Sequence, residues 1–452
     1  MLSHLKLTNV GPAATMDLAL SSRLNVLTGD NGLGKSFLLD IAWWALTRRW
    51  PAQVNRKLAA GLLARPRASG PASIDFGVTT ATGQQAYACT FDRKAEAWVG
   101  RTGRPLSPAL VLYAMVDGSF AVWDPARNYW RENGTQDVQD RVPSYVFTPD
   151  ELWNGLQGER GPLSNGLVRD WAGWQKEGGT AFLRLTRVLE ALSPSPEEQI
   201  RPGGLTRISL DDPRDIPTLE MPYGPPVPVL HASAGMRRII ALAYLLVWSW
   251  EEHLRASKLL DQEPTGDVVF LVDEIEAHLH PRWQRRIVPA LLAVVNSMEP
   301  YLQALSDSSE ARLPGRLPAQ ATRRANVQLI ATTHSPLVLA SLEPNFDPER
   351  DAWFDRDLVP DEPEARVAIT RRPFVRRGDA SSWLVSDAFD LASARSVEAE
   401  KALEEAALAL SDEDFDTERA RAMDARLRQV LGDTDPFWMN WRFVGERRGW
   451  LP

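Results

Sequence analysis

A glycine-rich stretch near the start of the chain constrains the fold more than any other feature of the sequence. Residues 29–36 read GDNGLGKS and fit the phosphate-binding pattern G-x-x-x-x-G-K-[ST]. The apolar run at residues 24–28 is typical of a short buried strand, and apolar residues after the loop recur at helical spacing as far as Pro51. A strand, a glycine-rich loop and a helix in this order predict an α/β fold that binds phosphate where the helix begins.

Each residue type in this loop suits a different contact with a nucleotide. Glycine lets backbone N–H groups approach an anion closely, and the helix N-terminus adds the positive end of its dipole. We expect Lys35 to reach the β- and γ-phosphates and the Ser36 hydroxyl to hold Mg²⁺. The residues predicted to bind the nucleotide are Gly29, Asn31, Gly32, Gly34, Lys35 and Ser36.

A pair of acidic residues follows the most apolar strand-like segment of the chain. Val268–Val272 is continuously apolar, which is typical of a central parallel strand buried on both faces, and Asp273 and Glu274 come directly after it. In α/β sheets, ligands bind at the carboxyl ends of the strands. We therefore expect Asp273 to hold Mg²⁺, as the acidic partner of Ser36, and Glu274 to accept a proton from an attacking water.

A histidine follows the next strand-like segment in the same way. Val327–Thr332 reads as another buried strand, and His334 stands two residues after it. An isolated histidine is more often structural, but the parallel with Asp273 and Glu274 favours a catalytic role for His334. We predict that its imidazole contacts a phosphate or the attacking water.

Small residues precede the longest apolar helix that the sequence predicts. Residues 231–246 read HASAGMRRIIALAYLL, in which Ser233 is a suitable N-cap and Gly235 permits close backbone approach. Taken alone, this pattern indicates only where a helix begins.

The composition limits which partners and which cellular compartment suit the protein. With 51 basic and 59 acidic residues the net charge is −8, so DNA binding would need a local basic patch. The basic run at residues 55–72 is more readily explained as a solvated linker than as such a patch. The single cysteine, Cys89, fits a reducing compartment, and neither a signal peptide nor an apolar window of membrane-spanning length is visible. We expect a cytoplasmic protein without a membrane partner.

The pattern of turns and breaks predicts five regions. Residues 1–72 hold the phosphate loop, and residues 73–124 are expected to form an antiparallel β-subdomain around two hairpins. Residues 125–230 are expected to be a helical, tryptophan-containing insert that ends in an irregular, proline-rich connector. Residues 231–342 carry the acidic pair and the histidine, and residues 343–452 are expected to be mainly helical, with a helical hairpin and an aromatic end at residues 437–443.

The motifs together resemble those of the ABC-type ATPases, in the branch that contains RecF, the SMC heads and the overcoming-lysogenization-defect ATPases. GDNGLGKS resembles Walker A, VVFLVDE resembles Walker B with its adjacent glutamate, and ATTHSP resembles the loop of the switch histidine. Residues 276–281, EAHLHP, resemble the D-loop, and residues 232–237, ASAGMR, resemble a divergent signature motif. Gln157 is a candidate for the glutamine of the Q-loop. The resemblance covers about residues 1–60 and 230–342.

The resemblance implies an ATPase that uses ATP and Mg²⁺ and works as a dimer of heads. Such heads bind two ATP molecules between them, so Ser233 and Gly235 would act on the nucleotide of the partner copy. A homodimer or a higher oligomer is therefore expected. The chain also resembles the stand-alone ATPase subunit of bacterial anti-phage systems of the Septu or PARIS type, which implies a separate effector protein, possibly a nuclease.

The sequence is also compatible with other functions. The sequence has no long heptad arm of the kind that bridges DNA, and Asp355 and Asp357 are too few for a Toprim nuclease. A nucleotide-dependent scaffold or sensor with negligible turnover is one alternative. A RecF-like DNA-repair ATPase is another, and it would show salt-dependent DNA binding.

Overall fold

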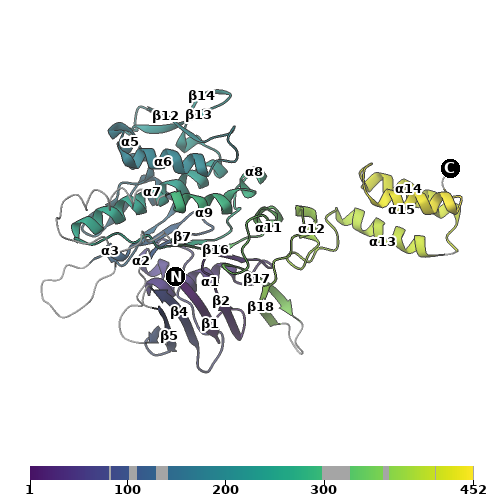
Figure 1. Cartoon of the computed structure of the whole chain (residues 1–452), viewed down its shortest axis with the longest axis horizontal. Helices are drawn as coiled ribbons and strands as arrows, with labels where there is room; N and C mark the ends of the chain where they lie inside the picture. Colours follow the sequence, from purple (N-terminus) through teal and green to yellow (C-terminus); the bar gives the residue numbers. More distant parts are fainter. Residues whose placement is uncertain are drawn as a thin grey trace, which may run out of the picture. The chain divides into compact units, whose positions relative to one another are not determined.

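The chain divides into two compact units, Met1–Arg376 and Arg377–Pro452. The structure is a computed structural model that describes residues 1–80, 83–100, 109–128, 141–297, 326–359, 366–412 and 414–450 (Figure 1). Among these residues, no helix is both long enough and apolar enough to cross a membrane.

The first unit is built on a mixed sheet whose five central strands run parallel. In spatial order the eight strands are β18 (Arg366–Arg372), β17 (Asp351–Val359), β3 (Leu24–Leu27), β16 (Val327–Thr332), β15 (Val268–Val272), β7 (Leu110–Ala114), β8 (Phe120–Trp123) and β9 (Tyr145–Phe147). The strands from β17 to β7 are mutually parallel, and β18, β8 and β9 are antiparallel at the two edges. The predictions of buried strands before the phosphate loop, before Asp273 and before His334 are confirmed.

A second sheet is antiparallel, and its apolar side chains pack in one cluster with those of the first helix. Its strands, in spatial order, are β2 (Thr15–Ala19), β1 (Leu2–Thr8), β4 (Ser73–Thr80), β5 (Gly83–Asp92) and β6 (Ala97–Gly100). Helix α1 (Lys35–Thr47) contacts β1 of this sheet and β7, β15 and β16 of the central sheet. One apolar cluster joins all three layers, and the indole of Trp43 at its centre is fully buried. The start of α1 is therefore held between two sheets.

The remaining helices of the unit pack mainly with one another and against the opposite side of the central sheet (Figure 1). The longest is α7 (Ala234–Leu259), which contacts α6, while α9 contacts both α6 and β16. The other elements are α2 (Pro51–Val54), α3 (Pro125–Asn128), α4 (Pro149–Asn154), β10 (Leu156–Gly158), β11 (Gly161–Ser164), α5 (Leu167–Glu177), α6 (Thr180–Ala191), the 3₁₀ helix η1 (Val229–His231), α8 (Pro281–Gln284), α9 (Ile287–Ser297) and α11 (Pro336–Leu342). Helix α4 begins with a capping box that Thr148 and Glu151 form.

The structure differs from the predicted regions in three places. The hairpin β7–β8 belongs to the central sheet rather than to a subdomain at residues 73–124, since Leu110–Ala114 is buried throughout and does not alternate. The proline-rich connector is in part a three-stranded sheet of β12 (Arg201–Thr206), β13 (Ile216–Met221) and β14 (Gly224–Pro228), in which the prolines of β14 lie on an edge strand. Within residues 343–452, the strand-like segment expected at residues 366–370 is β18, and together with β17 it completes the central sheet instead of belonging to the helical C-terminal region.

The second unit is a small helical cluster around tryptophan. It contains α12 (Ala380–Leu384), α13 (Val397–Ser411), α14 (Thr417–Val430) and α15 (Phe437–Arg447). The predicted helical hairpin is α13–α14, and the aromatic end docks on it as α15. Trp441 is fully buried, and its indole Nε1 donates to Asp424 Oδ1 at 3.1 Å. This unit has its own apolar cluster.

We predict that Trp441→Ala destabilises the second unit by about 3–5 kcal/mol, because it empties the centre of the cluster. Amide hydrogen exchange measured by peptide should rise across α13–α15 and stay unchanged in β3 and β16. Met439→Ala is the matched control, since Met439 lies on the same helix with 75% of its surface exposed. Equal exchange in the two variants would contradict the assignment of Trp441 to the core.

Candidate active site

The N-terminus of α1 has no capping side chain, unlike several other helices of the chain. Its N-cap is Gly34, with φ of 85°, no side chain caps it, and the first turn has no acidic residue. In contrast, hydroxyl side chains of Thr148, Ser233 and Ser335 cap α4, α7 and α11. Uncapped backbone N–H groups at a helix N-terminus are suited to bind an anion, so the phosphate loop is open where phosphate is expected.

Lys35 folds back over the loop that precedes it. Its Nζ donates to the backbone oxygens of Gly29 at 2.6 Å and Asp30 at 2.8 Å. Burial, and then the positive charge of Arg356, lower the pKa of Lys35 to about 8. The ammonium group is therefore held inside the loop by neutral carbonyl oxygens, which phosphate oxygens can replace.

One threonine hydroxyl ties the two predicted acidic residues to the neighbouring strand. Thr332 Oγ1 donates to Asp273 Oδ1 at 2.7 Å, and it accepts from the backbone N–H of Glu274 at 2.7 Å. Asp273 and Thr332 are both buried, whereas Glu274 is partly exposed. Glu274 also has φ of 44°, a left-handed conformation that is uncommon outside glycine. The Thr332 hydroxyl thus fixes the backbone turn from which the Glu274 carboxylate leaves the sheet.

His334 is held at the end of the next strand by another acidic residue. The carboxylate of Glu276 accepts from the backbone N–H of His334 and from Thr333 Oγ1, the latter at 2.7 Å. Burial, and then the charge of Lys35, lower the pKa of His334, so its imidazole is neutral at pH 7. A neutral imidazole can donate a hydrogen bond from one nitrogen while the other accepts.

The donor set fits Mg²⁺ bound together with a nucleotide. Ser36 is exposed on the first turn of α1, and Asp273 ends β15, two strands away from β3 in the sheet. Mg²⁺ is commonly held by one or two protein oxygens together with phosphates and water. Ser36 and Asp273 would hold it, and the ion would neutralise charge on the transferred phosphate.

The structure brings the phosphate loop, Asp273, Glu274 and His334 to one edge of the central sheet. The electrostatic coupling of Lys35 to Asp273, Glu274 and His334 follows from this arrangement. Ser233 and Gly235 lie at the start of α7, where Ser233 Oγ caps the helix and Gly235 packs on the backbone of His278. Among the described residues, no hydrogen bond joins Ser233 or Gly235 to the phosphate loop.

Three further residues, for which no individual role was predicted, support this site. Thr332 and Glu276 position the carboxylate turn and the histidine, as described above. The third, Arg238 on α7, donates to the backbone oxygens of Met115 at 2.8 Å and Asp273 at 3.2 Å. Thr332 and Glu276 could have been found from their place at a strand end and beside Asp273. Arg238 carries no such signal, because only the folded chain brings α7 to β15.

The candidate Q-loop residue is not at this edge. Gln157 lies in β10, which pairs only with β11 in a separate two-stranded sheet. On one side of β15 lies β7, which ends at Ala114, and Met115 follows it.

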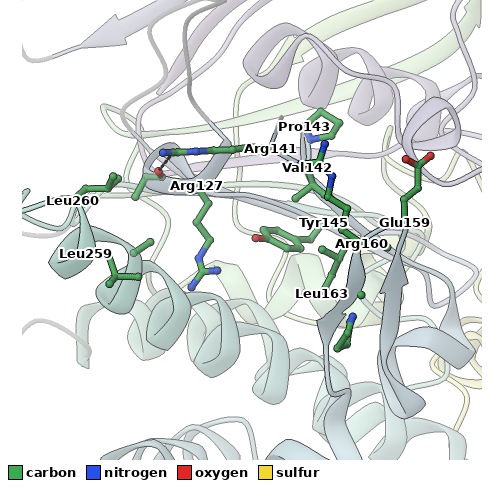
Figure 2. A pocket seen from close by; sticks show the side chains of 15 residues that line it. Arg127, Arg141, Val142, Pro143, Tyr145, Glu159, Arg160, Leu163, Leu259 and Leu260 are labelled. Carbon is green, nitrogen blue, oxygen red and sulfur yellow. Dashed lines mark hydrogen bonds between the residues drawn. The ribbon is translucent and has the colours of Figure 1, made fainter. Parts of the chain in front are cut away.

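A separate cavity of about 660 Å³ lies at the other end of α7. Figure 2 shows Arg127 and Tyr145 between the leucines that end α7, Leu259 and Leu260, and the β10–β11 hairpin. Leu259 follows Arg238 by 21 residues along the helix, or roughly 30 Å. This cavity is therefore distinct from the phosphate loop.

Fold and site together define an ABC-type P-loop ATPase head. The family described as "AAA domain, putative AbiEii toxin, Type IV TA system" matches residues 24–340, and the chain belongs to this family. This match includes the phosphate loop, the acidic pair and the histidine.

Known proteins show more distant similarity. A curated relative, the "Retron Ec83 probable ATPase" of Escherichia coli, is 26% identical over 228 residues, which are 49% of this chain and 33% of the relative. The chain thus spans about a third of that relative's length. Among solved structures, the SMC head domain from Thermotoga maritima is 14% identical with a TM-score of 0.37, over 82% of this chain and 99% of that one. An SmcHead bound to the C-winged helix domain of ScpA is 12% identical with a TM-score of 0.41, over 82% and 98%.

We predict that affinity for Mg·ATP falls as pH rises above about 8, because Lys35 then loses its proton in the nucleotide-free loop. Bound phosphate favours the charged form, so binding should take up a proton in this range, and affinity should fall by at most about tenfold per pH unit. Calorimetry in buffers of different ionisation enthalpy measures this uptake. Lys35→Arg keeps its charge and should show none, and equal uptake in both proteins would exclude Lys35 as its source.

We also predict that Thr332→Val lowers ATP turnover by about 100-fold while ATP affinity changes little, because the Glu274 carboxylate loses its fixed position. Steady-state phosphate release and nucleotide titration measure the two effects. Thr47→Val is the matched control, since Thr47 is also buried and its hydroxyl donates within α1 to Trp43 O at 2.9 Å. The positioning role fails if the two variants turn over ATP equally.

Proposed function

We propose that this protein hydrolyses ATP, that ATP drives two copies to associate through their heads, and that this association controls a separate effector protein in anti-phage defence. The cofactors are ATP and Mg²⁺. The hydrolytic residues are Glu274, as the base that accepts a proton from water, and His334, as a contact for phosphate or water.

The observation that carries the hydrolytic part is the position of Glu274. Glu274 follows a buried strand, and Thr332 holds its backbone N–H in place. It stands next to the buried Asp273, and its charge acts on Lys35. A protein that only bound ATP would have no need for a strained, partly exposed glutamate at this point. An ordinary general base contributes about 10²–10⁴-fold, so Glu274→Gln should slow turnover by that factor and spare nucleotide binding.

The start of α7 supports association of two heads. Ser233 and Ala234 are exposed, and Gly235 lets the helix lie close to the backbone of His278. A Cβ atom at Gly235 would stand 2.7 Å from the His278 oxygen. The helix end therefore packs tightly on the D-loop-like segment and still presents a hydroxyl and backbone N–H groups outward. These groups suit the γ-phosphate held by another copy.

The defence part of the proposal rests on similarity. The E. coli relative is named as the probable ATPase of a retron, and the motifs resemble stand-alone ATPase subunits of anti-phage systems. We infer from this that the protein acts on a separate effector, for which a nuclease is the first candidate. Direct DNA binding is the alternative, and a salt-dependent affinity for duplex DNA would favour a RecF-like role.

Light scattering after size exclusion tests association most directly. We predict that the mass of Glu274→Gln doubles with Mg·ATP and stays that of one chain without it, because hydrolysis no longer releases the partner. A mass that is already doubled without ATP would favour the scaffold reading. A single chain under both conditions, with ATP binding confirmed, would overturn the two-headed proposal.

Glu263→Gln is the matched control for this experiment. Glu263 is exposed and lies between α7 and β15, so the same change of charge occurs away from the site. This variant should hydrolyse ATP like the unaltered protein and should not accumulate the doubled mass.

A further inference from the structure

An arginine on β17 is buried beside the phosphate loop with most of its guanidinium unpaired. The side chain of Arg356 is fully buried. Its Nη2 lies 3.3 Å from Met16 Sδ, and within the described part of the chain its Nε and Nη1 have no hydrogen-bond partner. Native proteins pair nearly all buried polar groups, so two unpaired guanidinium nitrogens at one site call for an explanation.

Strand register places this arginine against both ends of the phosphate loop. β17 runs parallel to β3 with Phe354 opposite Leu27, so the residues that follow Phe354 continue beside the start of the loop. A Cβ atom at Gly29 would stand 2.3 Å from the Arg356 backbone oxygen, and one at Gly34 would stand 3.4 Å from Nη1. The guanidinium therefore lies next to the residue that begins α1.

The acidic residues nearest in sequence do not neutralise this charge. Asp355 accepts from Thr28 Oγ1 at 2.7 Å and lies 3.7 Å from Arg372 Nε, and Asp357 pairs with Arg372 Nη2 at 2.7 Å. Side chains alternate along a strand, so Asp355 and Asp357 leave β17 on the face opposite to Arg356. Burial alone lowers the pKa of Arg356, to about 10, and it stays charged at neutral pH.

We propose that Arg356 is a second phosphate-binding cation of the nucleotide site, acting beside Lys35 as counter-charge for the phosphates of a nucleoside di- or triphosphate. This inference rests on the proposed binding of nucleotide and adds a residue that lies outside every motif of the sequence. A buried cation without partners destabilises the empty protein. Phosphate oxygens bound at the start of α1 would pair with the guanidinium. Binding would then relieve the unfavourable burial of Arg356, and this gain would add to the affinity for the nucleotide.

The test uses the full chain and measures nucleotide affinity and the midpoint of thermal unfolding. If Arg356 served only in packing, a substitution would lower both together. Arg356→Met keeps an unbranched side chain in an apolar setting and removes the charge. Calorimetric titration with Mg·ATP and with Mg·ADP should show affinity weaker by about tenfold to a hundredfold, the size expected for a charged hydrogen bond. Thermal unfolding without nucleotide should show a midpoint that is unchanged or higher, because an unpaired buried cation is gone.

Two further variants keep the outcome decisive. Arg356→Lys retains a cation and should retain most of the affinity, whereas a role in packing alone predicts that Lys and Met behave alike. If Arg356→Met fails to fold, Arg356→Gln takes its place against Arg356→Lys. Arg169→Met makes the same change of charge at an exposed residue of α5 and should bind both nucleotides as the unaltered protein does.

Failure of this inference differs from failure of the proposed function. If the unaltered protein binds ATP, Lys35→Ala does not, and Arg356→Met binds within about twofold of the unaltered protein, Arg356 is no phosphate-binding residue. A loss of affinity and stability that Arg356→Lys shares with Arg356→Met would also overturn the inference. If the unaltered protein itself binds neither ATP nor ADP, the proposed function falls.

Discussion

The site depends on a single constraint, the parallel register of β3, β16 and β15. Parallel strands end at one edge of a sheet, so the phosphate loop, His334 and the acidic pair meet although about 300 residues separate the loop from His334 along the chain. The Thr332 hydroxyl then fixes the positions of the two acidic residues, because it forms hydrogen bonds with both the Asp273 carboxylate and the Glu274 backbone N–H. Without that register, none of the motifs could act on the same phosphate.

Much of the site could be predicted because its chemistry is local in sequence. The loop at residues 29–36, Asp273 with Glu274, and His334 each follow a strand whose apolar residues identify it, and α/β folds bind ligands at such ends. The supporting residues are different in kind. Arg238 lies on α7 directly after the signature-like ASAGMR segment, Arg356 lies on a strand without a motif, and only packing of distant segments brings the two side chains to the site. Their roles could not be predicted from spacing.

The wrong boundaries also have physical causes. Residues 110–114 are as continuously apolar as Val268–Val272, so the pattern of a buried central strand was present but was outweighed by the hairpin signal at Asp117 and Gly118. Strand β17 was harder to predict, because it carries Asp351, Asp355, Arg356 and Asp357 within nine residues. The charges are compatible with a buried strand only because Asp351 pairs with Arg23, and Asp355 and Asp357 lie near Arg372. Because several residues of β17 are charged and paired in this way, the strand does not show the continuous apolar pattern that predicts a buried strand.

The position of β3 has a consequence for how the chain acquires its structure. Both neighbours of β3 in the sheet, β16 and β17, are synthesised about 300 residues after it, whereas β1, β2, β4 and β5 can pair as soon as residue 92 has been made. Non-local parallel pairing forms slowly, and unpaired apolar strands promote aggregation. The antiparallel sheet is thus available early as a surface that shelters α1, and the phosphate loop gains its neighbour Arg356 only when β17 is in place. A chain that ends between residues 36 and 351 would carry the whole GDNGLGKS motif without the strand that places Arg356 beside it.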